Sequence, residues 1–132
     1  MPAQTLNPSG LSTPTGYAHI AIVPAGRQVH VAGQVALNPA REVVGRGDLA
    51  AQAEQVYLNL KAALAGAGAT FAQVFKVVTY VVDLTPEKAA MVRAVRNRYF
   101  GDGPYPAATM VGVTSLVDPA FLIEIEVIAA LD

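Results

Sequence analysis

The sequence contains no cysteine, only two histidines and few charged residues. Without cysteine the chain can form no disulfide, no thiolate metal site and no cysteine nucleophile. His19 and His30 cannot build a three-histidine zinc site, and neither has a carboxylate at a close metal-ligand spacing. We therefore expect no metal site.

Charge is also scarce. Charged residues make up 14% of the chain, against about 25% in a typical soluble domain. The net charge is −1 and Lys and Arg are scattered, so the chain lacks the basic footprint of a protein that binds nucleic acid or an anionic membrane. No apolar run reaches the ~20 residues of a membrane span, and the N-terminus lacks the pattern of a signal peptide. We expect a soluble, cytoplasmic protein.

The length of 132 residues corresponds to one domain. We expect residues 1–132 to form a single domain, in which residues 1–16, rich in Pro, Ser, Thr and Gly, are an extended lead-in. The apolar fraction is 53%, and so few charges cannot cover the surface of a monomer well. We therefore expect part of the apolar surface to be covered by another copy of the chain.

Five apolar segments resemble strands. The segments "YAHIAIV" and "QVHVAGQVAL" are separated by "PAGR", which predicts a β-hairpin. The β-branched run "FAQVFKVVTYVVDL" ends at Asp83, and the closing runs "YPAATMVGV" and "FLIEIEVIAAL" look like a strand pair.

Two segments have the spacing of helices. Asp48 is placed as the N-cap of "LAAQAEQVYLNLKAALAGAG", which Gly66 and Gly68 end. Thr85 and Pro86 begin the second helix, for which we expect a buried stripe of Met91, Val92, Val95 and Tyr99. The order β-β-α-β-α-β-β predicts an α+β sheet with both helices on one face. Because the central strand is apolar on both faces, we expect self-association through the other face.

Glu124 and Glu126 share one face of the last strand, opposite Ile123, Ile125 and Val127. In an exposed strand this would be ordinary alternation with the polar face in water. On a covered face, a carboxylate would be partly desolvated, with its pKa raised, and could act as a base or hold a water. Both interpretations stay open.

Arg93 and Arg96 lie one turn apart on the second helix. The more common arrangement is a solvated helix face, and the alternative is that Arg93 points toward a substrate carboxylate. His30 is expected to be structural, while His19 could equally face a pocket. The glycines of "GAGATF" are explained by a helix end, and neither a GxSxG motif nor a P-loop occurs.

Several segments together resemble the RidA (YjgF) family over nearly the whole chain: "GYAH", "VAGQVALNP", "VFKVVTYVVDL" and "YPAATMVGV" with "LIEIEVIA". The resemblance implies a chorismate-mutase-like α+β fold and a homotrimer with sites in the clefts between subunits. Members of the best-known branch hydrolyse enamines and imines, such as aminoacrylate, to keto acids and ammonia. They need no metal or organic cofactor.

The resemblance also assigns roles to particular residues. Tyr17 matches a tyrosine near the site, Gly33 and Gln34 match the turn that lines it, and Glu124 matches the carboxylate that positions the attacking water. Arg93 stands where that branch usually has asparagine. The arginine that grips the substrate carboxylate would fall at Ala108, which cannot bind a carboxylate.

This departure leaves two hypotheses for function. The first is a divergent imine deaminase or related hydrolase in which Glu124 positions water and Arg93 or His19 recognises the ligand. Thr109 adds a hydroxyl, although it should point to the opposite side of the strand from Ala108. The second is a non-catalytic, ligand-binding trimer that has lost hydrolysis. A third activity, RNA cleavage, has little support in a near-neutral chain.

Overall fold

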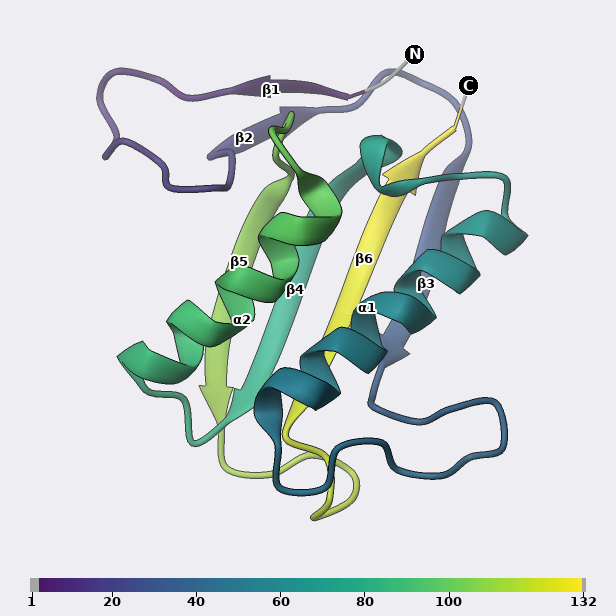
Figure 1. Cartoon of the computed structure of the whole chain (residues 1–132). Helices are drawn as coiled ribbons and strands as arrows, with labels where there is room; N and C mark the ends of the chain where they lie inside the picture. The colour runs from purple at the N-terminus through teal and green to yellow at the C-terminus, as the bar shows by residue number, and fades with distance from the viewer. Residues whose placement is uncertain (1–2, 132) are drawn as a thin grey trace.

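The computed structural model describes residues 3–131. Within them, helices α1 (Leu49–Gly66) and α2 (Pro86–Phe100) lie side by side on one face of a four-stranded sheet (Figure 1). The strand order is β3-β6-β4-β5, with β3 at Gln28–Gln34, β4 at Val74–Val82, β5 at Ala107–Val113 and β6 at Ile123–Ala130. A short 3₁₀ helix, η1 (Phe71–Gln73), precedes β4. The predicted α+β class and the placement of both helices on one face are confirmed.

Both predicted helix starts are confirmed, because each depends on a local hydrogen bond. The Asp48 carboxylate accepts a hydrogen bond from the Ala51 N–H, and the Thr85 hydroxyl accepts one from the Lys88 N–H. Each bond satisfies an N–H that has no partner within the first turn of its helix. Pro86 occupies the first turn of α2, where a missing N–H costs nothing.

The predicted strand partners are wrong in two places. Residues 17–23 and β3 do not form a hairpin: β2 (Ile20–Ile22) pairs instead with β1 (Gln4–Leu6), inside the predicted lead-in. The closing runs do not pair with each other either, since β5 lies parallel to β4 and β6 lies antiparallel between β3 and β4. Alternation marks a segment as a strand but carries no information about which strand lies beside it.

The core lies between the helices and the sheet. Val77 and Val81 of β4 and Ile123, Ile125 and Val127 of β6 are almost fully buried there. The intervening side chains of both strands, Glu124 and Glu126 among them, are half-buried on the face without helices. The predicted separation of the two carboxylates from the apolar residues of β6 is thus confirmed.

The buried stripe of α2 differs from the prediction. Val92 and Val95 are buried as expected, but Met91 is 42% exposed and Tyr99 only half-buried. Arg96 and Phe100 are buried instead, one and two turns after Val92. Val92, Arg96 and Phe100 recur every four residues, so they lie on one side of the helix.

Candidate functional site

Glu124 lies directly against Gly33. A Cβ atom added to Gly33 would lie 2.0 Å from Oε2 of Glu124 and 2.8 Å from its Cδ. No other residue type could occupy position 33 without displacing the carboxylate, since real Cβ atoms are never found so close to another heavy atom. The register of the sheet is irregular between Val31 and Gln34, which is where β3 passes this carboxylate. The structure therefore brings together two residues that the sequence assigned to one site.

Glu126, two residues along β6, has a partner of its own. The Tyr80 hydroxyl donates a hydrogen bond of 2.8 Å to its Oε1. This bond raises the pKa of Tyr80, because the neutral hydroxyl is the form that donates. Glu126 lines a hollow of about 420 Å³ on the open face of the sheet, together with His30 and Lys76. The two glutamates are therefore unlike: Glu126 is bound by a tyrosine, and Glu124 lies over a glycine.

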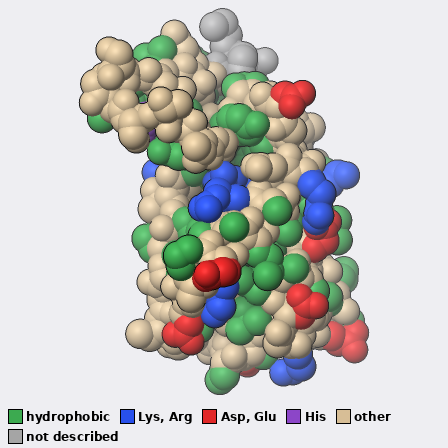
Figure 2. Space-filling view, turned by 60° about the vertical axis from the view of Figure 1, so that its left-hand side comes forward, with side chains coloured by type: hydrophobic (Ala, Val, Ile, Leu, Met, Phe, Trp, Pro, Cys, Tyr) green, Lys and Arg blue, Asp and Glu red, His purple; other side chains and the backbone are tan. Residues whose placement is uncertain are grey.

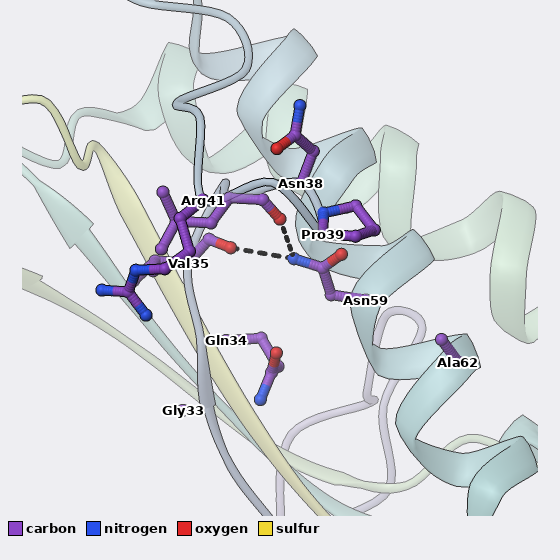
Figure 3. A pocket seen from close by; sticks show the side chains of 9 residues that line it. Gly33, Gln34, Val35, Asn38, Pro39, Arg41, Asn59 and Ala62 are labelled. Atoms are coloured by element: carbon purple, nitrogen blue, oxygen red, sulfur yellow. Dashed lines mark hydrogen bonds between the residues drawn. The ribbon is translucent and has the colours of Figure 1, made fainter.

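Gln34 and Gly33 line a second hollow, of about 400 Å³, between β3 and α1 (Figure 3). The wall of this hollow is fixed by Asn59 of α1, whose Nδ2 donates hydrogen bonds to the carbonyls of Val35 and Leu37. The Gln34 amide donates to the carbonyl of Ala32, two residues back in its own strand. These bonds hold the turn after β3 in place beside Glu124.

A third, smaller cleft of about 150 Å³ lies at the other edge of the sheet, between β5, α2 and the N-terminal segment. Its lining includes Tyr17, Arg93 and Thr109, all three predicted as site residues, and also Arg96 and Ala108. Figure 2 views the molecule from this side and shows basic side chains gathered below the overhanging N-terminal segment. The cleft is smaller than the ~300–1,000 Å³ pockets that hold drug-sized ligands, so it suits a small metabolite.

His19 lies next to Tyr17, which lines this cleft. Its ring packs edge-on against Tyr17, with centroids 5.2 Å apart, and its Nε2 lies 2.7 Å from the carbonyl oxygen of Ser12. His19 is not among the residues that line the cleft, and its contact there is through Tyr17.

The prediction for Arg96 needs correction. A solvated helix face was the favoured interpretation for Arg93 and Arg96, and Arg93 is exposed as expected. Arg96, however, is only 6% exposed. Burial lowers its pKa, and the positive charge of Arg93 adds to that shift. Sequence reasoning did not place Arg96 in the site, although its spacing from Val92 and Phe100 was a signal that could have found it.

Within one chain the two groups of site residues face away from each other. Ala108 pairs with Val77, so it lies on the helix-covered face, whereas Glu124 pairs with Tyr80 on the open face. Strand β4 also separates β5 from β6, which places the two strands about 10 Å apart. A single copy therefore cannot bring the Glu124 carboxylate to a ligand held between β5 and α2.

The family model described as Endoribonuclease L-PSP matches residues 9–131. The chain belongs to the RidA (YjgF) family. Relatives include protein DfrA of Myxococcus xanthus, 39% identical over 76% of this chain and 74% of its own. A RutC family protein of Pyrococcus abyssi is 36% identical over 81% of both chains. The family assignment made from the sequence is confirmed.

Solved structures agree with this RidA family fold. A Rid family protein of unknown function from Yersinia pestis, YyfB, superposes with a TM-score of 0.91 at 42% identity, over 99% of this chain and all of its own. A protein of Thermotoga maritima described as a putative endoribonuclease has a TM-score of 0.72 at 30% identity, over 100% and 98% of the two chains.

Residues 3–131 of this RidA family member contain no candidate for a membrane-spanning helix or for a metal site. Among residues 3–131, no helix has both the length and the apolar character required to cross a bilayer. In the same part of the chain, no group of three or more His, Cys, Asp or Glu side chains is close enough together to hold a metal ion.

Proposed function

We propose that this protein hydrolyses a small enamine or imine in a cleft formed between copies of the chain, with Glu124 as the base that activates water. The observation that carries the proposal is the contact between Glu124 and Gly33: a carboxylate with no side chain beneath it, half-buried on the face without helices. A relative from Dermatophagoides farinae, 29% identical over 83% of both chains, is described as a 2-iminobutanoate/2-iminopropanoate deaminase.

The chemistry requires one water for each C=N bond. The water oxygen bonds to the imine carbon while Glu124 takes the proton that the water loses. That proton passes to the nitrogen and gives a carbinolamine. The carbinolamine hydroxyl then gives up its own proton, which Glu124 passes to the nitrogen, and the C–N bond breaks as the C=O bond forms, so that ammonia leaves a carbonyl product. No electrons are gained or lost, and a side-chain carboxylate suffices as the base.

The placement of the site residues supports an oligomer. Glu124 and Gly33 lie on the open face of the sheet, whereas Tyr17, Arg93 and Ala108 line a cleft on the helix-covered side. Thr109 also borders this cleft, but it pairs with Val78, as Glu126 does, so its side chain lies on the open face, opposite that of Ala108 as expected. Only a second copy can place its β5–α2 cleft against the Glu124 of the first. The half-buried Val78, Tyr80 and Ile128 on the open face are the apolar surface that such a partner would cover. A homotrimer, as the family resemblance implies, would repeat this contact three times.

The alternative function is ligand binding without hydrolysis, and Ala108 favours it. Alanine at this position removes the guanidinium expected to grip a substrate carboxylate. A protein that keeps the cleft but not that contact could act as a small-molecule sensor.

The test is the loss of freshly generated 2-aminoacrylate and 2-iminopropanoate in the presence of the wild type, Glu124→Gln and Glu126→Gln. We expect wild-type hydrolysis, a fall of about 10²- to 10⁴-fold in Glu124→Gln, and a change of no more than a few fold in Glu126→Gln. Glu126 is the matched control because it lies on the same strand and face. Equal rates in the wild type and Glu124→Gln would contradict the proposal.

An Ala108→Arg variant separates the two functions. If the wild type does not hydrolyse the imines and this variant does, Glu124 can still activate water. The natural ligand is then not one of these two imino acids. If both are silent while small ligands still bind, the binding function is favoured.

A further inference from the structure

Arg96 is a buried cation for which residues 3–131 leave two guanidinium nitrogens unpaired. Its side chain is 6% exposed, and among residues 3–131 no oxygen accepts a hydrogen bond from its Nε or Nη2. A buried guanidinium that lacks acceptors destabilises a fold by several kcal/mol, in the order of magnitude known for unpaired buried charges. Such a group is retained where a ligand or a bound water supplies the missing acceptors.

The surroundings of Arg96 contain positive charge and hydroxyls. The groups that act on its charge are Arg93, which lowers its pKa, and the hydroxyls of Tyr57 and Tyr105, which raise it. The Tyr57 hydroxyl is itself buried and has no hydrogen-bond partner in the described part of the chain. No carboxylate of residues 3–131 is among the groups that shift the pKa of this guanidinium, so the local field favours an anion.

The backbone around Arg96 leaves room for it. Gly16, with φ of 79°, lies over the guanidinium, and a Cβ atom there would be 3.0 Å from Nη2. On the other side of the cleft the small side chain of Ala108 replaces the long one expected at that position. The same cleft is lined by Arg93 at its exposed edge and by the hydroxyl-bearing Thr15, Tyr17 and Thr79.

We infer that Arg96 binds the carboxylate of the ligand, so that the anion-binding group of this site comes from α2 instead of β5. Its planar fork supplies two parallel N–H donors to a carboxylate, and Arg93 adds a second positive charge nearby. The choice of a carboxylate as the ligand group rests on the proposed function, in which the substrate is an imino acid. The role of Arg96 rests on its burial and its missing acceptors.

The probe is pyruvate, the stable keto acid that hydrolysis of 2-iminopropanoate would release, with its uncharged amide as the matched control ligand. Isothermal titration of the full chain should detect pyruvate but not pyruvamide. In Arg96→Met, pyruvate binding should weaken by about 30-fold or more, as expected when one partner of a buried charge pair is truncated. In Arg98→Met, which removes the same charge from the exposed side of the same helix, affinity should stay within about twofold.

A second measurement separates binding from a structural role. Methionine has a similar length and no charge, so Arg96→Met should melt at the same temperature as the wild type or higher when no ligand is present. It should also lose the rise in melting temperature that pyruvate causes in the wild type. A lower melting temperature together with an unchanged pyruvate affinity would overturn the inference and make Arg96 a structural residue.

A double variant tests whether an arginine on β5 can replace Arg96 in binding pyruvate. In Arg96→Met/Ala108→Arg, a guanidinium returns to the cleft from the opposite wall, and pyruvate binding should recover at least tenfold relative to Arg96→Met. No recovery, with a folded protein, would count against a shared anion site.

The inference and the proposed function can fail separately. If pyruvate binding depends on Arg96 but neither imine is hydrolysed, the anion site stands and the hydrolase proposal fails. If hydrolysis depends on Glu124 but its KM is unchanged in Arg96→Met, the hydrolase proposal stands and the role of Arg96 fails.

Discussion

Helix α1 buries the side chain of Gln52, and helix α2 buries that of Arg96, but their hydrogen bonding differs completely. The Gln52 amide donates to the carbonyls of Gly45 and Ala120 and accepts from the Leu122 N–H. In contrast, residues 3–131 provide no acceptor for Nε or Nη2 of the Arg96 guanidinium. A buried polar group with every bond made stabilises the fold, whereas one left incomplete marks a place where the fold depends on something outside the chain. The comparison therefore separates a structural region from a binding region.

The largest expected loss of stability follows the substitution of Gln52. In Gln52→Leu the shape is nearly kept, but the Ala120 carbonyl and the Leu122 N–H lose their partner, while the Gly45 carbonyl keeps a hydrogen bond from the Asp48 N–H. We expect the free energy of unfolding to fall by about 2 kcal/mol or more, at roughly 1–3 kcal/mol for each of these buried groups left unpaired. Urea denaturation measures it.

Gln55→Leu is the control for this change, because Gln55 is half-buried and its side chain donates to Asn59 on the same helix. Its unfolding free energy should fall by less than about 1 kcal/mol. Equal losses of stability in the two variants would contradict a structural role for Gln52, since its hydrogen bonds would then contribute no more than those of Gln55.

A smaller effect is expected at Gly16, which lies over Arg96. In Gly16→Ala the new methyl group would press on Nη2, and a φ of 79° is strained for any residue with a Cβ. We expect a loss of about 1 kcal/mol of stability and weaker pyruvate binding.

The matched control is Gly68→Ala, because Gly68 has the same φ of 79° and nothing within 4 Å of the added Cβ. It should lose similar stability but keep its affinity for pyruvate. If Gly16→Ala binds pyruvate as the wild type does, the N-terminal segment has no part in the anion site.

The smallest expected change in stability concerns Glu54, the partner of Arg98, which is the exposed counterpart of Arg96 on α2. Tyr99 and Arg98 both donate to the Glu54 carboxylate of α1. The hydrogen bond from Tyr99, with the charge of Arg98, holds the pKa of Glu54 below its ordinary value of 4.5. A lowered pKa stabilises the fold at pH above 4.5, and this contribution is lost as the pH falls through the lowered value.

Between about pH 5.5 and pH 3 the wild type should lose slightly more stability than Glu54→Gln, by less than about 1 kcal/mol because the pair is exposed. Denaturant unfolding at the two pH values measures this difference. Glu42→Gln, in an exposed loop, should follow the wild type. A steeper loss in Glu54→Gln than in the wild type would contradict the assignment.

Local signals explain the parts of the fold that the sequence predicted well. Asp48, Thr85 and Pro86 act within one turn of the helices that they begin, so their effect is visible in a short window. Strand partners are chosen over long separations, which is why the predicted pairing of the two closing runs was wrong. β5 requires the crossover through α2 to lie parallel to β4, and β6 inserts between strands that are far apart in the sequence.

The site was predictable only in part. Residues carried over by resemblance fall into two groups, Glu124 with Gly33 and Tyr17 with Arg93, and the structure places these groups on opposite faces. Arg96 was missed because an arginine on a helix usually extends its charged end into water. The spacing of Arg96 from Val92 and Phe100 was a local signal for its burial, whereas its contact with Gly16, eighty residues away in the sequence, has no counterpart in a short window.

In the proposed active site, Glu124 of one copy and the arginines of a second copy line the same cleft. An experiment with mixed subunits tests this arrangement. The Glu124→Gln and Arg96→Met chains would each be expressed and purified alone, and in a third preparation co-expressed in equal amounts. All three samples would be assayed with 2-iminopropanoate. Each variant alone should be nearly inactive. The mixed oligomer should recover about one quarter of the wild-type rate, since random assembly pairs an intact Glu124 with an intact Arg96 at one site in four. If the mixture is no more active than the separate variants, the two groups of residues do not form a shared site.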